Sequence, residues 1–313
     1  MRIVLQETQR ALFYGPIYCA FALGAFREEG LDVILQASAR PDDAVRSVLD
    51  GRCDLGWGGP MRVIVEHDRN PASDLKCFCE FVTRDPFVLV GRKPCPDFTL
   101  AKLFGVRLGV VREVPTPWCC LQEDLHRAGL DVGKLTLGPD RTMAENAAAL
   151  RAGEVDVVQL LEPAVTELVA QGAGHIWYEA ARRGPASYTA FYALDRVMAA
   201  RRKEFTRMTR AIYRSQQWVC RSSAAAIAAA ISGYFPAVAP GRLHAGIDRY
   251  LRLGIWGATP HLPRAGFDTL RASLLTGGLV ATGVSFDEVV DNDMTAEAVA
   301  SAPPPLSMLS HEG

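Results

Sequence analysis

The sequence Gly51-Arg-Cys-Asp-Leu-Gly-Trp-Gly-Gly-Pro60 (GRCDLGWGGP) contains a short apolar run that ends in two glycines and a proline. Residues 53–56 are predicted to form a buried strand, and Pro60 suits the first turn of a following helix. The glycines allow backbone N–H groups to approach a ligand closely. The stretch therefore predicts a strand that ends at a loop able to contact a small molecule.

A second stretch, Gly153-Glu-Val-Asp-Val-Val-Gln-Leu-Leu-Glu-Pro163, repeats this layout about a hundred residues later. In each copy a helix is predicted to end at the glycine, an aspartate follows three residues on, and the proline opens the next helix. One interpretation is that any two strand–helix–strand units look alike. The other is that two units of similar topology present matching loops at the carboxyl ends of their sheets, where ligands bind in open α/β sheets.

Strands and helices alternate on both sides of these two stretches, which predicts an α/β fold. The first series has predicted strands at 2–6, 31–36, 53–56, 77–83 and 87–91, with helices at 15–28, 41–49 and 60–67. Residues 92–98 contain two prolines and are predicted to be a crossing point. The second series has predicted strands at 106–111, 135–137, 155–160 and 175–178, with helices at 117–128, 143–151 and 164–171. Residues 188–194 are predicted to return the chain to the first unit, and the pattern is helical from about 197.

Length and charge limit the function classes. The 313 residues suit two domains, and a net charge of −1 from 34 basic and 35 acidic residues gives no case for nucleic-acid binding. No apolar run is long enough to span a membrane. Met1 leads directly into a predicted strand, so we expect either a cytoplasmic protein, as the chain is written, or a periplasmic one whose leader has been removed.

The eight cysteines show none of the C-x-x-C pairs of zinc sites or redox motifs. We expect them to be structural thiols, which weakly favours a reducing compartment. No metal and no cofactor is predicted.

Four segments of the chain resemble one protein family. They are FYGPIYCAFALGAFREEGLDVIL (13–35), LDGRCDLGW (49–57), LFGVRLGVV (103–111) and AALRAGEVDVVQLLEP (148–163). In them the chain resembles the solute-binding proteins of the NMT1/THI5-like group, whose members have the type II periplasmic-binding fold and bind sulfonates, nitrate or thiamine-pyrimidine precursors. The resemblance covers about residues 1–220.

The resemblance implies a two-lobed protein that closes on a small molecule. Lobe one would comprise residues 1–91 and 194–301, and lobe two residues 92–193, each a mainly parallel sheet flanked by helices. Extra helices would follow at the C-terminal end, and residues 302–313 would form a disordered tail. The implied partners are a small-molecule ligand and an ABC permease, and we expect a monomer.

Four loops are expected to line the cleft, at residues 13–15, 57–60, 80–85 and 113–119. The candidate ligand-binding residues are Phe13, Tyr14, Trp57, Gly58, Gly59, Glu80, Arg84, Thr116, Trp118, Cys119, Glu162, Tyr188 and Thr189. Relatives often carry Thr-His-Ala-Pro in the first loop, where this chain has Phe-Tyr-Gly-Pro (13–16), so aromatic contact would replace polar contact.

The fourth loop is the strongest candidate for an anion site. Thr116 is predicted to cap the following helix, which would leave the amides of Trp118 and Cys119 free to donate to an anion. Trp118 would be either an aromatic wall or a buried anchor. Arg84 and Arg112 would pair with a carboxylate or sulfonate, or be ordinary surface arginines.

Glu162 is predicted to be either a polar contact for a ligand amine, hydroxyl or ring N–H, or a charge stabilised at a helix N-terminus. Tyr188 and Thr189 begin the returning strand and are expected to reach the ligand.

The aromatic candidates favour a planar ligand over nitrate: an aromatic or heteroaromatic acid, or a pyrimidine. On this interpretation Trp57 is a cleft wall, and Trp57→Ala should weaken binding with little loss of stability.

An enzyme of the same fold is the alternative. Eukaryotic pyrimidine synthases carry a Cys-Cys-Cys-Phe-Cys run before the returning strand, whereas here Cys77-Phe78-Cys79 lies about a hundred residues earlier and residues 184–190 contain no cysteine. In a decarboxylase, Glu80 and Glu162 would be the candidate acid–base groups. A ligand-sensing role with a separate partner is a third class. We expect a binding protein and not an enzyme.

Overall fold

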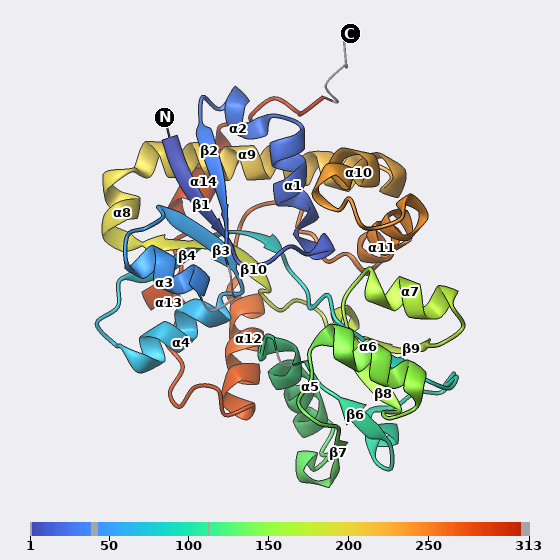
Figure 1. The fold of residues 1–313 in the computed structure, drawn as a ribbon. Coiled ribbons are helices and arrows are strands. Elements are labelled where there is room, and N and C mark those ends of the chain that lie inside the picture. Colours follow the sequence, from blue (N-terminus) through green and yellow to red (C-terminus); the bar gives the residue numbers. More distant parts are fainter. Residues whose placement is uncertain (1, 39–42, 112, 308–313) are drawn as a thin grey trace.

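The computed structural model describes residues 2–38, 43–111 and 113–307. Arg112, a candidate for pairing with an anionic ligand, lies outside the described residues. Within them the chain forms two five-stranded sheets flanked by helices, which confirms the predicted α/β class (Figure 1). No helix in these ranges is both long enough and apolar enough to cross a bilayer.

The two sheets have the same topology. The first has the order β2(Asp32–Ala37)–β1(Arg2–Glu7)–β3(Leu55–Gly58)–β10(Thr189–Leu194)–β4(Leu75–Val82). The second has the order β7(Thr136–Leu137)–β6(Arg107–Gly109)–β8(Val157–Leu160)–β5(Val88–Gly91)–β9(His175–Glu179). In each sheet only the strand in the fourth place, β10 or β5, is antiparallel to its neighbours. Four strands of each sheet point in the same direction, as predicted, but the one antiparallel strand makes both sheets mixed.

The antiparallel strands correct the predicted crossing points. β5 pairs with β8 and β9, so it belongs to the second sheet and not to the unit 1–91. β10 pairs with β3 and β4, so it belongs to the first sheet and not to the unit 92–193. The chain therefore crosses at residues 83–87 and returns at 180–188, before each of the two strands. The prolines of residues 92–98 follow β5 and do not mark the crossing.

Helices cover both faces of each sheet. One face of the first sheet packs against α1(Gly15–Ala22), α2(Ala25–Glu28), α9(Arg202–Arg221), α10(Ala224–Ile231), α11(Pro240–Leu253) and α14(Asp293–Ala300). Its other face packs against α3(Asp43–Leu49), α4(Met61–Arg69), α12(Arg264–Thr276) and α13(Phe286–Val289). The second sheet lies between α5(Thr116–Arg127) and the pair α6(Met143–Ala152) and α7(Ala164–Ala170), and α8(Asp195–Ala200) follows β10. The single helix predicted at 15–28 is two helices, because Gly24 has a φ of 73°.

The repeated sequence pattern has an architectural role. Gly51 and Gly153 both have the left-handed φ that ends a helix. Asp54 Oδ2 accepts a hydrogen bond from the Val4 amide at 2.7 Å, and Asp156 Oδ2 accepts one from the Arg107 amide at 2.9 Å. Each aspartate thus hydrogen-bonds to the backbone of the neighbouring strand, β1 or β6, near its start. The repeat marks β3 and β8, which occupy the same place in the two sheets.

The end of the chain is more ordered than predicted. Arg214 Nε donates to the Pro304 carbonyl at 2.6 Å, and the Leu306 side chain is buried in the core of the first sheet. Residues 302–307 therefore pack on the fold. The rest of the predicted tail, residues 308–313, lies outside the described residues.

Candidate ligand-binding site

A small cavity lies between the two sheets. It is lined by Thr8, Gln9, Phe13, Tyr14, Gly59, Met61, Arg62, Phe87, Val114, Thr116 and Tyr188. These residues follow β1, β3 and β6 or lie in the two crossings, so the cavity is at the carboxyl ends of parallel strands. Its volume is about 30 Å³, room for roughly two waters.

Aromatic rings form most of the apolar wall. The Phe13 and Tyr188 rings meet edge to face with centroids 6.1 Å apart, and the Phe87 ring lies 6.5 Å from that of Tyr188. Burial raises the pKa of Tyr14 and of Tyr188 well above the usual value for tyrosine, so both remain neutral phenols. The Tyr188 hydroxyl is buried and has no hydrogen-bond partner within the described ranges. The wall therefore offers planar apolar surfaces with neutral hydroxyls.

Arg62 supplies positive charge to the cavity. It lies in the first turn of α4, directly after the Gly-Gly-Pro loop, and is only 8% exposed. Gly58 makes room for it, since a Cβ there would lie 3.1 Å from Arg62 Nε. Burial raises the pKa of Tyr192 to about 12, and the Arg62 charge opposes this rise. Arg62 is thus a buried cation beside two tyrosines, Tyr14 and Tyr192.

Five of the candidate residues line this cavity: Phe13, Tyr14, Gly59, Thr116 and Tyr188. Gly58 precedes Gly59 in the chain and does not itself line the cavity. Its lack of a side chain leaves room for Arg62, which does. The other candidate residues do not line the cavity, and the structure places them as follows.

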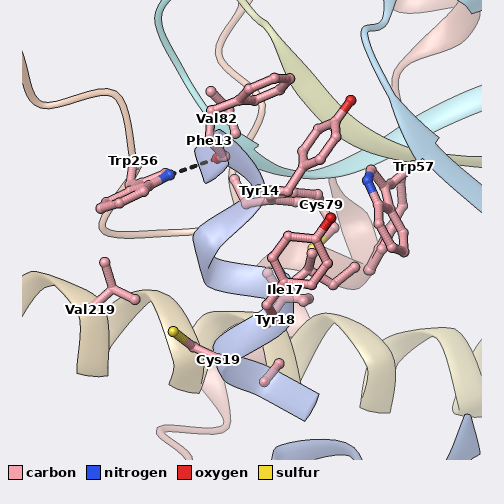
Figure 2. Packing of buried hydrophobic residues seen from close by; sticks show 14 of the residues in the cluster. Phe13, Tyr14, Ile17, Tyr18, Cys19, Trp57, Cys79, Val82, Val219 and Trp256 are labelled. Atoms are coloured by element: carbon pink, nitrogen blue, oxygen red, sulfur yellow. Dashed lines mark hydrogen bonds between the residues drawn. The ribbon is translucent and has the colours of Figure 1, made fainter. Parts of the chain in front are cut away.

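Trp57 belongs to the hydrophobic core. It is 0% exposed, pairs with Phe191 of β10, and contacts the rings of Tyr14 and Tyr18 at centroid distances of 5.8 and 6.3 Å. Figure 2 shows these three side chains packed together beside α1. Because side chains alternate along a strand, Trp57 faces the α1 side of the sheet while Gly58 faces the other side. The predicted cleft wall is therefore corrected to a core residue.

Glu162 forms a buried ion pair within the protein. Its Oε1 accepts from Arg249 Nε at 2.5 Å and its Oε2 accepts from the Thr166 amide at 3.0 Å. Arg249 also lies 3.4 Å from Glu179 Oε1. Both oxygens of Glu162 are thus occupied. The structure supports the second alternative, an acid at the N-terminus of a helix (α7), over a polar contact for the ligand.

The fourth predicted loop contributes less than expected. Helix α5 begins at Thr116 after Pro115, and no side chain caps it. The Cys119 amide already donates to the Pro115 carbonyl at 3.1 Å, and the Cys119 side chain packs against Gly277. Trp118 packs on the core of the second sheet. Thr116 thus lines the cavity, whereas Trp118 and Cys119 hold α5 in place.

Arg84 in the first crossing and Thr189 at the start of β10 lie outside the cavity lining. Arg84 Nη1 donates to the Ala181 carbonyl at 3.3 Å, which ties the two crossings together. Thr189 is 0% exposed in β10.

Glu80 is fully enclosed beneath the site. It is 0% exposed, and neither carboxyl oxygen has a hydrogen-bond partner among the described residues. Burial raises the pKa of Glu80 to about 8, and the nearby Ser187 hydroxyl opposes the rise. Glu80 is therefore held as a neutral acid near pH 7 and is not part of the cavity wall.

The Glu80 pKa predicts a pH dependence of stability. The folded chain keeps this proton to a higher pH than the unfolded chain, so the free energy of unfolding should fall as pH rises from about 5 to 8. We expect Glu80→Gln to remove about 2–4 kcal/mol of this fall. Urea unfolding at pH 5.5, 7.0 and 8.5 measures the difference, with Glu167→Gln, a change at an exposed acid of α7, as the control. Equal slopes for wild type and Glu80→Gln would contradict the prediction.

Five lining residues lie outside the loops predicted from the sequence and were not among the candidate residues: Thr8, Gln9, Met61, Arg62 and Phe87. Val114 belongs to the predicted loop 113–119 but was not a candidate residue either. Two signals were available. Thr8 and Gln9 directly follow the first predicted strand, and Arg62 lies two residues after Pro60 of the glycine loop. An arginine near the start of a helix is usually solvent-exposed, so its burial was visible only in the structure.

The two cysteines of the Cys77-Phe78-Cys79 segment carry no reactive signature. Cys77 and Cys79 are 0% exposed, and burial raises the pKa of both thiols. In the ranges the structure covers, no group of three or more histidines, cysteines or acids is placed to hold a metal ion.

Comparisons with known proteins identify the family. The sequence model of the family described as NMT1/THI5 like matches residues 14–226. YtlA of Bacillus subtilis (strain 168), described as a binding protein, is 26% identical over 302 residues, covering 96% of this chain and 90% of YtlA.

Solved structures show the same fold at low identity. The periplasmic aliphatic sulphonate binding protein SsuA from Escherichia coli has a TM-score of 0.75 and 15% identity, covering 94% of this chain and 99% of SsuA. The desulfurization enzyme DSZB has a TM-score of 0.71 and 14% identity, covering 96% of this chain and 99% of DSZB. The chain therefore belongs to the NMT1/THI5-like family and has the periplasmic-binding-protein fold.

Proposed function

We propose that the protein is a solute-binding protein that closes two lobes on a small organic molecule and delivers it to an ABC importer. The observation that carries this proposal is the cavity between the sheets, whose wall combines residues from lobe one with Val114 and Thr116 of lobe two. Closure around a ligand needs such a shared wall. The description of YtlA as a binding protein and that of SsuA as a sulphonate-binding protein support the same role.

The lining favours an aromatic or heteroaromatic anion, or a pyrimidine-like ring. Phe13, Tyr14, Phe87 and Tyr188 offer faces for a planar ring, and Arg62 offers a charge-assisted hydrogen bond to a carboxylate or sulfonate. Phe87 lines the cavity, whereas Trp57 and Trp118, the aromatic walls expected from the sequence, do not.

The same lining argues against the enzyme alternative. Its described residues include no histidine, cysteine, aspartate or glutamate. Thiol chemistry needs a cysteine, and acid–base chemistry most often uses a histidine or a carboxylate within reach of the substrate. Burial raises the pKa of the two lining tyrosines, Tyr14 and Tyr188, and so holds them as neutral phenols that are poor bases. The likeness to DSZB is a likeness of fold alone.

A thermal-shift and calorimetry screen tests the proposal. We expect benzenesulfonate and benzoate to raise Tm and bind more tightly than ethanesulfonate or nitrate, with a fall in the radius of gyration as the lobes close. Arg62→Gln should weaken benzenesulfonate binding by about 10- to 100-fold, because it removes a charged hydrogen bond.

Two outcomes would contradict the proposal. If only ethanesulfonate or nitrate stabilised the protein, the aromatic ligand class would be wrong. If none of the four anions bound and the purified protein carried no small molecule in native mass spectrometry, solute binding itself would be refuted.

A further inference from the structure

A second and larger cavity adjoins the first. Its volume is about 320 Å³, against about 30 Å³ for the cavity between the sheets. It lies between α3 and α4 of the first sheet, with Pro115 before α5 and Leu279 after α12 completing the wall. We call it the outer cavity. Met61 and Arg62 line both cavities, so the outer cavity continues the ligand site past these two side chains.

Size separates the roles of the two cavities. Ligand pockets usually have several hundred cubic ångströms, which the outer cavity reaches and the inner one does not. With the lobes as they are, the inner cavity has room for only one end of an organic ligand. The rest of such a molecule needs the outer cavity.

The walls of the outer cavity favour an apolar chain. Val45 and Leu49 on α3, Val65 on α4 and Leu279 are partly exposed side chains at the edge of the core beneath them. They present aliphatic surface without the planar rings that line the inner cavity. An alkyl or acyl chain would bury this surface, at a gain for each methylene.

Charge sets the sign of the ligand. Arg46, Arg62 and Arg69 line the outer cavity, against one acid, Glu66. Arg62, the buried member of the three, lies where the two cavities join. An anionic group is therefore favoured at this junction, and the exposed arginines attract anions to the entrance.

Resting on the proposed function, we propose that the ligand is a branched organic anion. Its aromatic ring contacts the inner cavity, its acid group pairs with Arg62 at the junction, and an alkyl or acyl chain extends along Leu49 and Val65 into the outer cavity. The outer cavity then selects among ligands by the length of this chain.

N-acylated phenylalanines are the test probes, because they carry a ring, a carboxylate and a chain of adjustable length. Calorimetry would compare chains of two, four, six and eight carbons. We expect affinity to rise about threefold with each added methylene until the outer cavity is filled. In Val65→Trp, which places an indole ring in the outer cavity, the gain with chain length should be lost. Val169→Trp, on the exposed surface of α7, is the matched control and should keep the gain.

The outcomes separate this proposal from the proposed function. An affinity that does not depend on chain length would refute the outer cavity as a subsite, and so would a gain in affinity with chain length that persists in Val65→Trp. Neither outcome would contradict the binding of benzenesulfonate. Binding of benzenesulfonate without binding of any N-acylphenylalanine would refute the subsite as well. Failure of every aromatic anion would refute the aromatic ligand class of the proposed function, and this inference with it.

Discussion

Trp57→Ala is expected to lower the free energy of unfolding by about 3–5 kcal/mol, the usual cost of truncating a large buried aromatic side chain. Trp57 is 0% exposed, and its ring meets those of Tyr14 and Tyr18 edge to face. Alanine would leave a cavity between β3 and α1 that these packed rings cannot fill. Urea unfolding followed by circular dichroism measures the loss.

Trp57→Phe is the matched variant. The Trp57 indole N–H is buried and has no hydrogen-bond partner among the described residues, so phenylalanine gives up no hydrogen bond and keeps part of the volume. We expect Trp57→Phe to lower the free energy of unfolding by less than half as much as Trp57→Ala does. Trp57→Ala should change the affinity of the folded protein for benzenesulfonate less than Arg62→Gln does. If Trp57→Ala left the stability unchanged but abolished binding, Trp57 would be a ligand contact and not a core residue.

The architecture could be predicted from the sequence because local patterns carry it. The glycine, aspartate and proline of each repeat correspond to a helix end, a bond to the neighbouring strand and a helix start, all within about ten residues. The face that Trp57 occupies was not predictable in this way. β3 is buried on both faces, so its sequence lacks the polar and apolar alternation that would orient it.

Long-range pairing explains the other errors. Glu162 lies next to a proline and a helix start, which in sequence suits a ligand contact as well as a structural acid. Its partner Arg249 is 87 residues away in a helix whose position the sequence does not give. Likewise β5 and β10 join their sheets through partners distant in sequence, so the local proline signal at 92–98 gave the wrong crossing. Most of the cavity residues that were found lie in segments between a predicted strand and the next predicted helix, and Tyr188 was found as the start of the returning strand.

Arg249→Met is expected to destabilise the protein by about 3–5 kcal/mol, because it leaves the buried Glu162 without its cation, whereas Glu179 keeps its ion pair with Arg182. The Glu162 side chain is 0% exposed and that of Glu179 is 7% exposed. Methionine retains most of the aliphatic volume of arginine. The loss of stability would therefore come from the missing charge and not from a cavity. Arg252→Met on the same helix is the matched control, since Arg252 pairs with Asp248 at the surface, where ion pairs contribute at most about 1 kcal/mol.

The same variant tests whether this ion pair joins the lobes. Helix α11 packs in the core of the first sheet through Leu243, Ile247 and Tyr250, whereas Glu162 and Glu179 follow or belong to strands of the second. Loss of Arg249 should therefore favour the open form and weaken benzenesulfonate binding by about tenfold, with a larger radius of gyration at saturating ligand. Adding Glu162→Gln to Arg249→Met should recover part of the stability, because the uncompensated charge is removed. Equal effects of Arg249→Met and Arg252→Met would show that the network does not hold the two sheets together.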